Sequence, residues 1–266
     1  MRLLQFVDRT ATGPRHLGLV DADEILDLTQ NGGPTSIHEL YYGLGGDQDG
    51  FEAALQRAID AASGNRRLGL ADLLAASQTD DLHLDVPVSG PDENPHALRV
   101  WLAGVTHEDS AKLREIEAKQ ATGDAVNVYE AKYRECAAGG RPELFSKGEP
   151  ETVVGHNRAI TRPADTERLV PETELISVYA LNAAGQVERI GYTGGNDATD
   201  NGIEATNPLN LPQAKNWSGA CASMGPLFVA ASAYDDADVT VSCEILRDGQ
   251  RVGFKEGKTG QANLNM

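Results

Sequence analysis

The sequence contains few aromatic residues, few cysteines and no long apolar run. Phe, Trp and Tyr make up only 5% of the 266 residues, so aliphatic side chains must fill most of any core. The three cysteines, Cys136, Cys221 and Cys243, show no C-x-x-C spacing, which favours reduced thiols over disulfides or a zinc site. No run of 18 apolar residues occurs, and the first residues lack the apolar segment of a signal peptide. We therefore expect a soluble, cytoplasmic protein with no membrane partner.

Basic residues are also scarce. The chain has 23 Lys and Arg residues against 40 Asp and Glu residues, which gives a formal net charge of −17. A surface of this charge repels polyanions, so nucleic acid is not expected as a partner. It also repels small anions, and an anionic substrate therefore needs local positive charge from a metal ion or a lysine.

The pattern of strands, helices and turns predicts two regions. Residues 1–90 contain short strands and a helical pattern at 51–62, which is typical of a small α+β domain. Three prolines and a glycine at 86–97 indicate a boundary. Residues 98–266 begin with a segment expected to be a buried strand, 98–105, and continue with many short strands, including a hairpin at the R-D-G-Q turn of 247–250. We predict an α+β, β-rich fold with a small N-terminal domain at 1–90 and a β-rich catalytic domain at 98–266.

A metal site is indicated between residues 172 and 215. Glu172 and Glu174 lie two residues apart in an apolar strand, so their side chains share one face. Asp197 follows the glycines of G-Y-T-G-G-N-D, in what we expect to be a turn. Three carboxylates suit Mg²⁺, with Mn²⁺ or Ca²⁺ as substitutes. A solvated strand face is the alternative for an isolated E-x-E pair, and the combination favours the metal.

Two further side chains are candidates for proton transfer. Lys215 follows the two-proline segment N-P-L-N-L-P-Q-A, which we expect to hold it in a non-helical approach. A desolvated lysine beside a metal has a lowered pKa and can act as a base, whereas an ordinary surface lysine is the alternative. Glu143, in R-P-E-L-F-S-K, is a candidate acid or a simple turn carboxylate, and Phe145 can form a pocket wall.

Taken together, these motifs resemble the fumarylacetoacetate hydrolase superfamily, which carries E-x-E, G-Y-T-x-x-N-D, a lysine, G-P and R-P-E-x-F-x-K. The resemblance covers about half the chain and implies that Glu172, Glu174 and Asp197 bind the metal. It implies that Lys215 binds and activates the substrate. It further implies a folded sheet or barrel and a homo-oligomer (dimer or tetramer). Members of the superfamily also have C-terminal strands that close the catalytic domain, and we expect these strands to be missing from this chain.

Two segments are similar to the superfamily's sugar-acid branch: W-L-A-G-V-T-H-E-D-S at 101–110 and N-P-L-N-L-P-Q-A-K at 207–215. The similarity implies Mg²⁺-dependent dehydration of a 2-keto-3-deoxy-pentonate to 2,5-dioxopentanoate. The histidine and glutamate that activate water in hydrolases of the superfamily are replaced by Ser110 and Leu113. A C–C hydrolase or decarboxylase of a 2,4-dioxo acid and a non-catalytic member of the fold are the alternatives. The predicted substrate-binding residues are Thr106, Ser110, Phe145, Lys147, Asn196 and Pro212.

Overall fold

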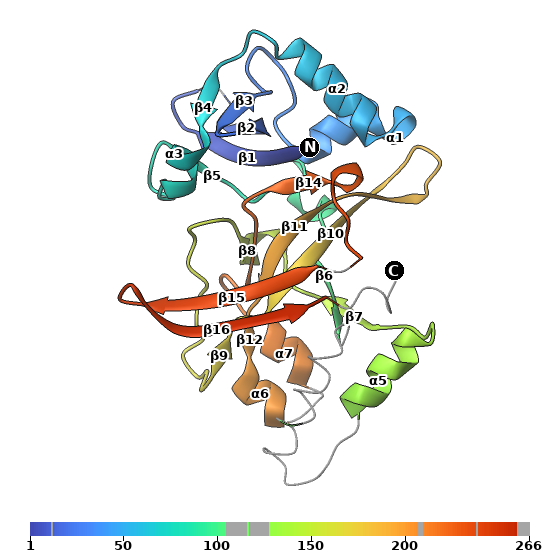
Figure 1. Ribbon diagram of the computed structural model, residues 1–266, viewed down its shortest axis with the longest axis vertical. Helices are drawn as coiled ribbons and strands as arrows, with labels where there is room; N and C mark the ends of the chain where they lie inside the picture. The colour runs from blue at the N-terminus through green and yellow to red at the C-terminus, as the bar shows by residue number, and fades with distance from the viewer. Residues whose placement is uncertain (12, 105–115, 117–127, 207–209, 238, 260–266) are drawn as a thin grey trace.

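The computed structural model is rich in strands and has few helices. It describes residues 1–266 apart from 12, 105–115, 117–127, 207–209, 238 and 260–266 (Figure 1). This content confirms the predicted α+β, β-rich class. No helix in the described residues is long and apolar enough to span a bilayer.

Ten of the described strands form one sheet in the order β4-β3-β2-β1-β14-β11-β13-β8, with β10 beside β11 and β5 beside β1. The bounds of these strands are β1 (Arg2–Asp8), β2 (Arg15–Asp21), β3 (Glu24–Asp27), β4 (Arg67–Gly69), β5 (Leu82–Leu84), β8 (Val153–Val154), β10 (Thr173–Leu181), β11 (Val187–Asp197), β13 (Ala222–Met224) and β14 (Phe228–Ala230). Three two-stranded sheets contain β6 (Trp101–Gly104) with β7 (Glu143–Ser146), β9 (Leu169–Val170) with β12 (Thr199–Asp200), and β15 (Thr240–Arg247) with β16 (Gln250–Lys258). The described helices are α1 (Gly46–Asp49), α2 (Phe51–Ala61), α3 (Leu70–Ala75), α5 (Val128–Ala137), α6 (Asn201–Thr206) and α7 (Leu211–Lys215), with further helical turns η1 (Glu39–Gly43), η2 (Pro95–Ala97), η3 (Pro150–Thr152) and η5 (Ala231–Ala233).

Strand β1 lies inside the large sheet, between strands of the first 90 residues and strands of the remainder. One edge of β1 pairs with β2, and the other pairs with β5 from Phe6 to Asp8 and with β14 at Arg2 and Leu3. Because β14 in turn pairs with β11, the sheet continues from the first 90 residues into the remainder. The division into domains at 1–90 and 98–266 stays a prediction, and the two regions share this sheet.

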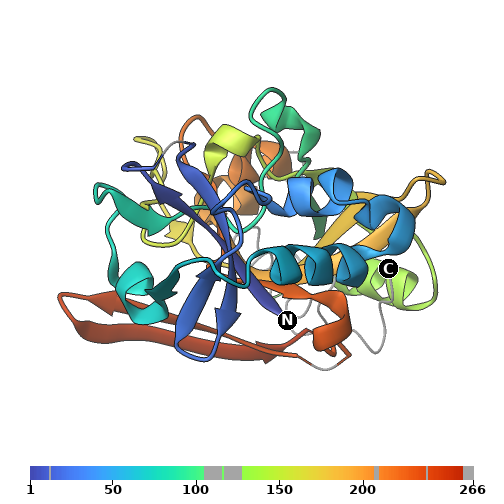
Figure 2. The ribbon, with the colours of Figure 1, turned by 90° about the horizontal axis from the view of Figure 1, so that it is seen from above.

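The core is also shared between the two regions. Helix α2 buries Phe51, Leu55 and two alanines on one face, as its helical spacing predicts. The ring of Phe51 lies 5.4 Å from the ring of Phe228, and both belong to one buried cluster with Leu3. Each such side chain contributes about 1.5–3 kcal/mol on burial. Figures 1 and 2 show α2 beside the N-terminal strands, where this cluster lies.

Strands β15 and β16 form a hairpin that extends beside the large sheet (Figures 1 and 2). Its turn residues Asp248 and Gly249 both have positive φ angles, 51° and 74°. Two consecutive residues of this kind are typical of the turn that matches the twist of paired strands. The hairpin predicted from R-D-G-Q is therefore confirmed.

The expectation of a buried strand at 98–105 is wrong. Within the described residues, β6 is only four residues long and pairs with β7 alone, outside the large sheet. The side chain of Trp101 is 64% exposed. An apolar run is typical of a strand inside a sheet whose two faces are both covered by other elements. Strands β6 and β7 do not belong to the large sheet.

Candidate metal centre and active site

The antiparallel pair β10–β11 brings the three predicted carboxylates together. Glu174 lies opposite Gly195, and the backbone N–H of Asp197 donates to the carbonyl of Glu172 at 2.8 Å. One carboxylate oxygen from each of Glu172, Glu174 and Asp197 lies within 4.8 Å of the others. The two glutamate carboxylates therefore lie close together as expected, although Glu172 precedes β10 and only Glu174 lies in the strand.

The three carboxylates suit a hard cation. Asp197 is buried, with 3% exposure, while Glu172 and Glu174 are half-buried. Oδ1 of Asp197 is buried and accepts no hydrogen bond, although the Lys147 ammonium lies 2.8 Å from it. A buried carboxylate oxygen without a donor is costly, and a cation is a natural partner for it. An all-oxygen set of ligands that leaves coordination positions open fits Mg²⁺.

Asp197 lies in strand β11 and not in the predicted turn. Gly195 serves close packing, because a Cβ there would lie 2.4 Å from Cδ1 of Ile176. Asn196 accepts a hydrogen bond from the backbone N–H of Glu172 at 3.0 Å and so helps to fix the first glutamate. Glycine in this motif therefore indicates a crowded strand and not a bend.

Lys215 reaches the carboxylates from the end of α7. Its Nζ donates to Oδ2 of Asp197 at 2.6 Å, to Oγ1 of Thr199 at 2.7 Å and to Oε2 of Glu172 at 3.0 Å. The residue is 3% exposed. Burial lowers the pKa of Lys215, but the charges of Asp197 and Glu172 outweigh burial and raise it. The lowered pKa expected from the sequence therefore does not hold beside these carboxylates alone.

The predicted non-helical approach of Lys215 is wrong. Pro212 is the second residue of helix α7, where the fixed φ of proline is compatible with a helix and its missing N–H group is not needed. The short helix places Ala214 and Lys215 in the interior. Pro212 itself is exposed.

Lys147 joins the same cluster. It is 3% exposed, and its ammonium makes an ion pair with Asp197. The cluster also contains a residue that the sequence analysis missed: the Thr199 hydroxyl accepts from Lys215 and donates to the carbonyl of Asp197 at 3.0 Å. Its position two residues after Asp197 is the only sequence signal that could have indicated it.

Of the remaining predicted residues, two lie on β7 and two lie outside the described part of the chain. Glu143 is exposed on β7 opposite Gly104, and Phe145 on the same strand is half-buried. No hydrogen bond or ion pair between described residues joins Glu143 to the three carboxylates. Thr106 and Ser110 lie outside the described residues.

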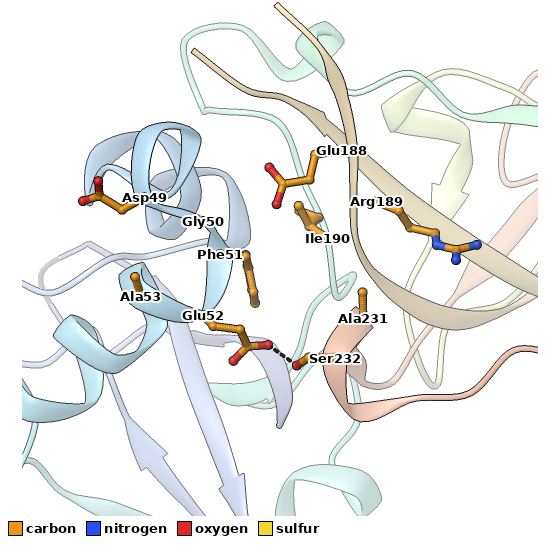
Figure 3. Close-up of a pocket in the computed structure, with 10 residues that line it drawn as sticks. All are labelled: Asp49, Gly50, Phe51, Glu52, Ala53, Glu188, Arg189, Ile190, Ala231 and Ser232. Carbon is orange, nitrogen blue, oxygen red and sulfur yellow. Dashed lines mark hydrogen bonds between the residues drawn. The ribbon is translucent and has the colours of Figure 1, made fainter. Parts of the chain in front are cut away.

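A pocket of about 230 Å³ lies elsewhere, between α1, α2, β11 and η5 (Figure 3). Glu52 and Glu188 contribute to its lining, and Ser232 donates a hydrogen bond to Glu52 across it. None of the predicted site residues lines this pocket. The clustered carboxylates and lysines have the chemistry of a reaction centre, and we take them as the candidate active site.

Two curated proteins are similar to this chain, although no family model matches it. The 2-dehydro-3-deoxy-D-arabinonate dehydratase of Saccharolobus solfataricus is 32% identical over 223 residues, which cover 82% of this chain and 67% of that protein. A probable 2-keto-3-deoxyxylonate dehydratase of Haloferax volcanii is 36% identical over 190 residues, which cover 67% of this chain and 58% of that protein. The chain thus spans between about half and two thirds of the length of these relatives.

Solved structures show the same relationship at the level of the fold. A 2-keto-3-deoxy-D-arabinonate dehydratase complexed with magnesium and 2,5-dioxopentanoate aligns with 100% of this chain and 79% of its own, at 25% identity and a TM-score of 0.65. The fumarylacetoacetate hydrolase of Exiguobacterium antarcticum aligns with 99% of this chain and 81% of its own, at 19% identity and a TM-score of 0.58. The chain belongs to the family of 2-keto-3-deoxy-pentonate dehydratases, and its fold is similar to that of fumarylacetoacetate hydrolase.

Proposed function

We propose that this chain is a magnesium-dependent dehydratase that converts a 2-keto-3-deoxy-pentonate to 2,5-dioxopentanoate. The observation that carries the proposal is the contact of the buried Lys215 ammonium with two of three clustered carboxylates, in a chain of this family. The magnesium and 2,5-dioxopentanoate named in the complex of a relative support the metal and the product.

In this proposal Glu172, Glu174 and Asp197 hold the Mg²⁺ ion, for which Mn²⁺ or Ca²⁺ can substitute. When bound, the ion supplies a Lewis acid that polarises the 2-oxo group of the substrate and makes the C3–H bond more acidic. Glu172 and Asp197 would hold the ion and also contact Nζ of Lys215, so the lysine lies beside the proposed metal site.

Lys215 is the proposed carrier of the C3 proton. Its ammonium is held at a fixed place by Asp197 and Thr199, which limits the motion needed for transfer. A cation bound at Glu172 and Asp197 would favour the neutral amine form of Lys215, which can accept a proton. A correctly placed general base contributes about 10²–10⁴-fold to the rate.

Glu143 is the proposed acid for the C4 hydroxyl group. Loss of the C3 proton and of this hydroxyl releases one water molecule, and tautomerisation then gives the C5 aldehyde of 2,5-dioxopentanoate. Exposure of Glu143 on β7 leaves its carboxyl group accessible to a substrate. Phe145, Asn196 and Pro212 are proposed to contact the substrate, together with the predicted residues outside the described part of the chain.

The test is a comparison of two substrate classes in the presence of Mg²⁺. We expect the purified chain to consume 2-keto-3-deoxy-arabinonate or -xylonate, to form 2,5-dioxopentanoate, and to lose this activity in EDTA. Consumption of an acylpyruvate instead would support a C–C hydrolase. Failure with every 2-oxo acid, together with no Mg²⁺ binding in calorimetry, would support a non-catalytic member of the fold.

We also propose the finer architecture implied by the resemblance, a folded sheet or barrel at 98–266 preceded by a small domain at 1–90. The fold likeness to the fumarylacetoacetate hydrolase of E. antarcticum supports this arrangement. The dimer or tetramer stays a prediction that light scattering of the purified chain can test. The cytoplasmic location and the absence of a nucleic-acid partner also stay predictions.

A further inference from the structure

The side chain of Lys147 is enclosed by protein oxygen atoms. Its Nζ donates to the carbonyl of Ala198 at 2.9 Å and to the carbonyl of Lys215, and it lies 2.8 Å from Oδ1 of Asp197. The indole ring of Trp217 covers a further side, with Nζ 5.4 Å from the ring centroid. An ammonium group has three protons. With three oxygens in contact and 3% exposure, Lys147 has no donor left for a substrate carboxylate.

The oxygens around Lys147 belong to two segments that carry the proposed chemistry. Ala198 follows Asp197 at the end of β11, and the other carbonyl is that of Lys215 itself. Ala198 and Lys215 are 17 residues apart in the sequence, and Lys147 contacts both. The carboxylate of Asp197 therefore lies between two ammonium groups, with Lys147 at Oδ1 and Lys215 at Oδ2.

The backbone around Lys147 is fixed independently of its ammonium. Its N–H donates to the carbonyl of Val100 at 2.9 Å, and the Asn216 amide donates to the carbonyl of Ser146 at 2.9 Å. Gly148 has a φ of 92°, and a Cβ there would lie 2.4 Å from Oγ1 of Thr152. The end of β7 is thus anchored next to α7 by contacts that do not involve the Lys147 ammonium.

We propose that Lys147 is a positioning residue that holds Asp197 and the Lys215 backbone in place for the metal, and not a substrate-binding residue. This inference rests on the proposed metal-dependent function. Groups that orient a metal ligand typically change metal affinity by about 10–100-fold when they are removed. Removal of the Lys147 ammonium leaves two carbonyls without this donor and Oδ1 of Asp197 without its ion pair, so the Asp197 carboxylate is free to turn away.

The experiment is a calorimetric titration of the whole chain with Mg²⁺ alone. We expect Lys147→Met to bind Mg²⁺ about 10–100-fold more weakly than the original chain. At saturating Mg²⁺ we expect a lower kcat with little change in KM, because the substrate does not contact this side chain. Lys132→Met is the control, since Lys132 is a half-buried lysine whose ion pair with Glu135 lies on α5, and it should leave Mg²⁺ affinity unchanged.

Unchanged Mg²⁺ affinity of Lys147→Met, with a raised KM, would overturn the inference and restore the substrate-binding role. If circular dichroism shows that the Met variant does not fold, the Mg²⁺ affinity of Lys147→Arg tests the positioning role instead. The guanidinium keeps the charge but not the compact geometry of an ammonium, so a positioning role predicts weaker Mg²⁺ binding and a charge-only role does not. A chain that binds Mg²⁺ but dehydrates no pentonate would contradict the proposed function, while the Mg²⁺ affinities of the variants would still decide the role of Lys147.

Discussion

The Lys215 ammonium lies 2.6 Å from Oδ2 of Asp197, and both side chains are buried. The same ammonium lies 3.0 Å from Glu172, so one lysine neutralises charge on two of the three candidate metal ligands. Buried carboxylates without a cation are costly, because water no longer solvates them. The Lys215 ammonium and a bound metal ion would therefore neutralise the same carboxylates. The stability and activity of variants at Lys215 should then depend on Mg²⁺.

Replacement of both glutamates tests the metal site. The double variant Glu172→Gln/Glu174→Gln keeps the size of both side chains but removes two of the three negative charges. We expect no Mg²⁺ binding in calorimetry, because amide oxygens hold the ion more weakly than carboxylates do. Glu244→Gln is the control, since Glu244 lies half-exposed on the β15–β16 hairpin. Undiminished binding by the double variant would exclude this site.

Replacement of Lys215 tests its role in proton transfer. Lys215→Met should lower kcat by about 10²–10⁴-fold in Mg²⁺. It should also lower the melting temperature more in EDTA than in Mg²⁺, because loss of one partner from a buried ion pair costs about 3–5 kcal/mol unless another cation compensates. Thermal melts in the two buffers measure this difference. Turnover close to that of the unaltered chain would rule out the role as a base.

A charge cluster in the first 90 residues predicts how stability depends on pH. Burial raises the pKa of Asp8, but hydrogen bonds from Thr10 and Arg66 outweigh it and lower the pKa from 3.8 to about 2. A lowered folded-state pKa adds stability above the unfolded value, here about 2 kcal/mol, and this stability is lost as the pH falls from about 5 to about 2. We expect Asp8→Asn to be less stable than the original chain at pH 7 and nearly equal to it at pH 2. Urea denaturation across this range measures the difference.

Asp92→Asn is the control for the pH series. Asp92 also pairs with an arginine, Arg15, but its side chain is 82% exposed. Exposed ion pairs contribute about 0–1 kcal/mol. A difference between the Asp8 variant and the unaltered chain that did not shrink at low pH would show that Asp8 acts through packing and not through its charge.

The carboxylate cluster could be predicted from the sequence because it depends on local rules. The two-residue spacing in an extended segment places Glu172, just before β10, near Glu174, and the turn between β10 and β11 returns the chain to Asp197. The hairpin of β15 and β16 was predictable for the same reason. The pairing of β1 with β14 joins residues more than 200 positions apart, and no local pattern specifies such a partner. The enclosure of Lys147 was missed because two segments distant from it in the sequence supply its contacts.

Gly191 tests whether the glycines of G-Y-T-G-G serve packing. A Cβ at this position would lie 2.2 Å from Cζ of Phe228 and 2.5 Å from the carbonyl oxygen of Val229. Phe228 is fully buried in the shared core and the carbonyl belongs to β14, so neither atom can move away easily. We expect Gly191→Ala to lower the free energy of unfolding by about 1–3 kcal/mol. Gly64→Ala is the matched control, because no heavy atom lies within 4 Å of the added Cβ. Urea denaturation should show a lower midpoint with an unchanged slope for the first variant alone, and equal midpoints would contradict the close approach of β11 and β14.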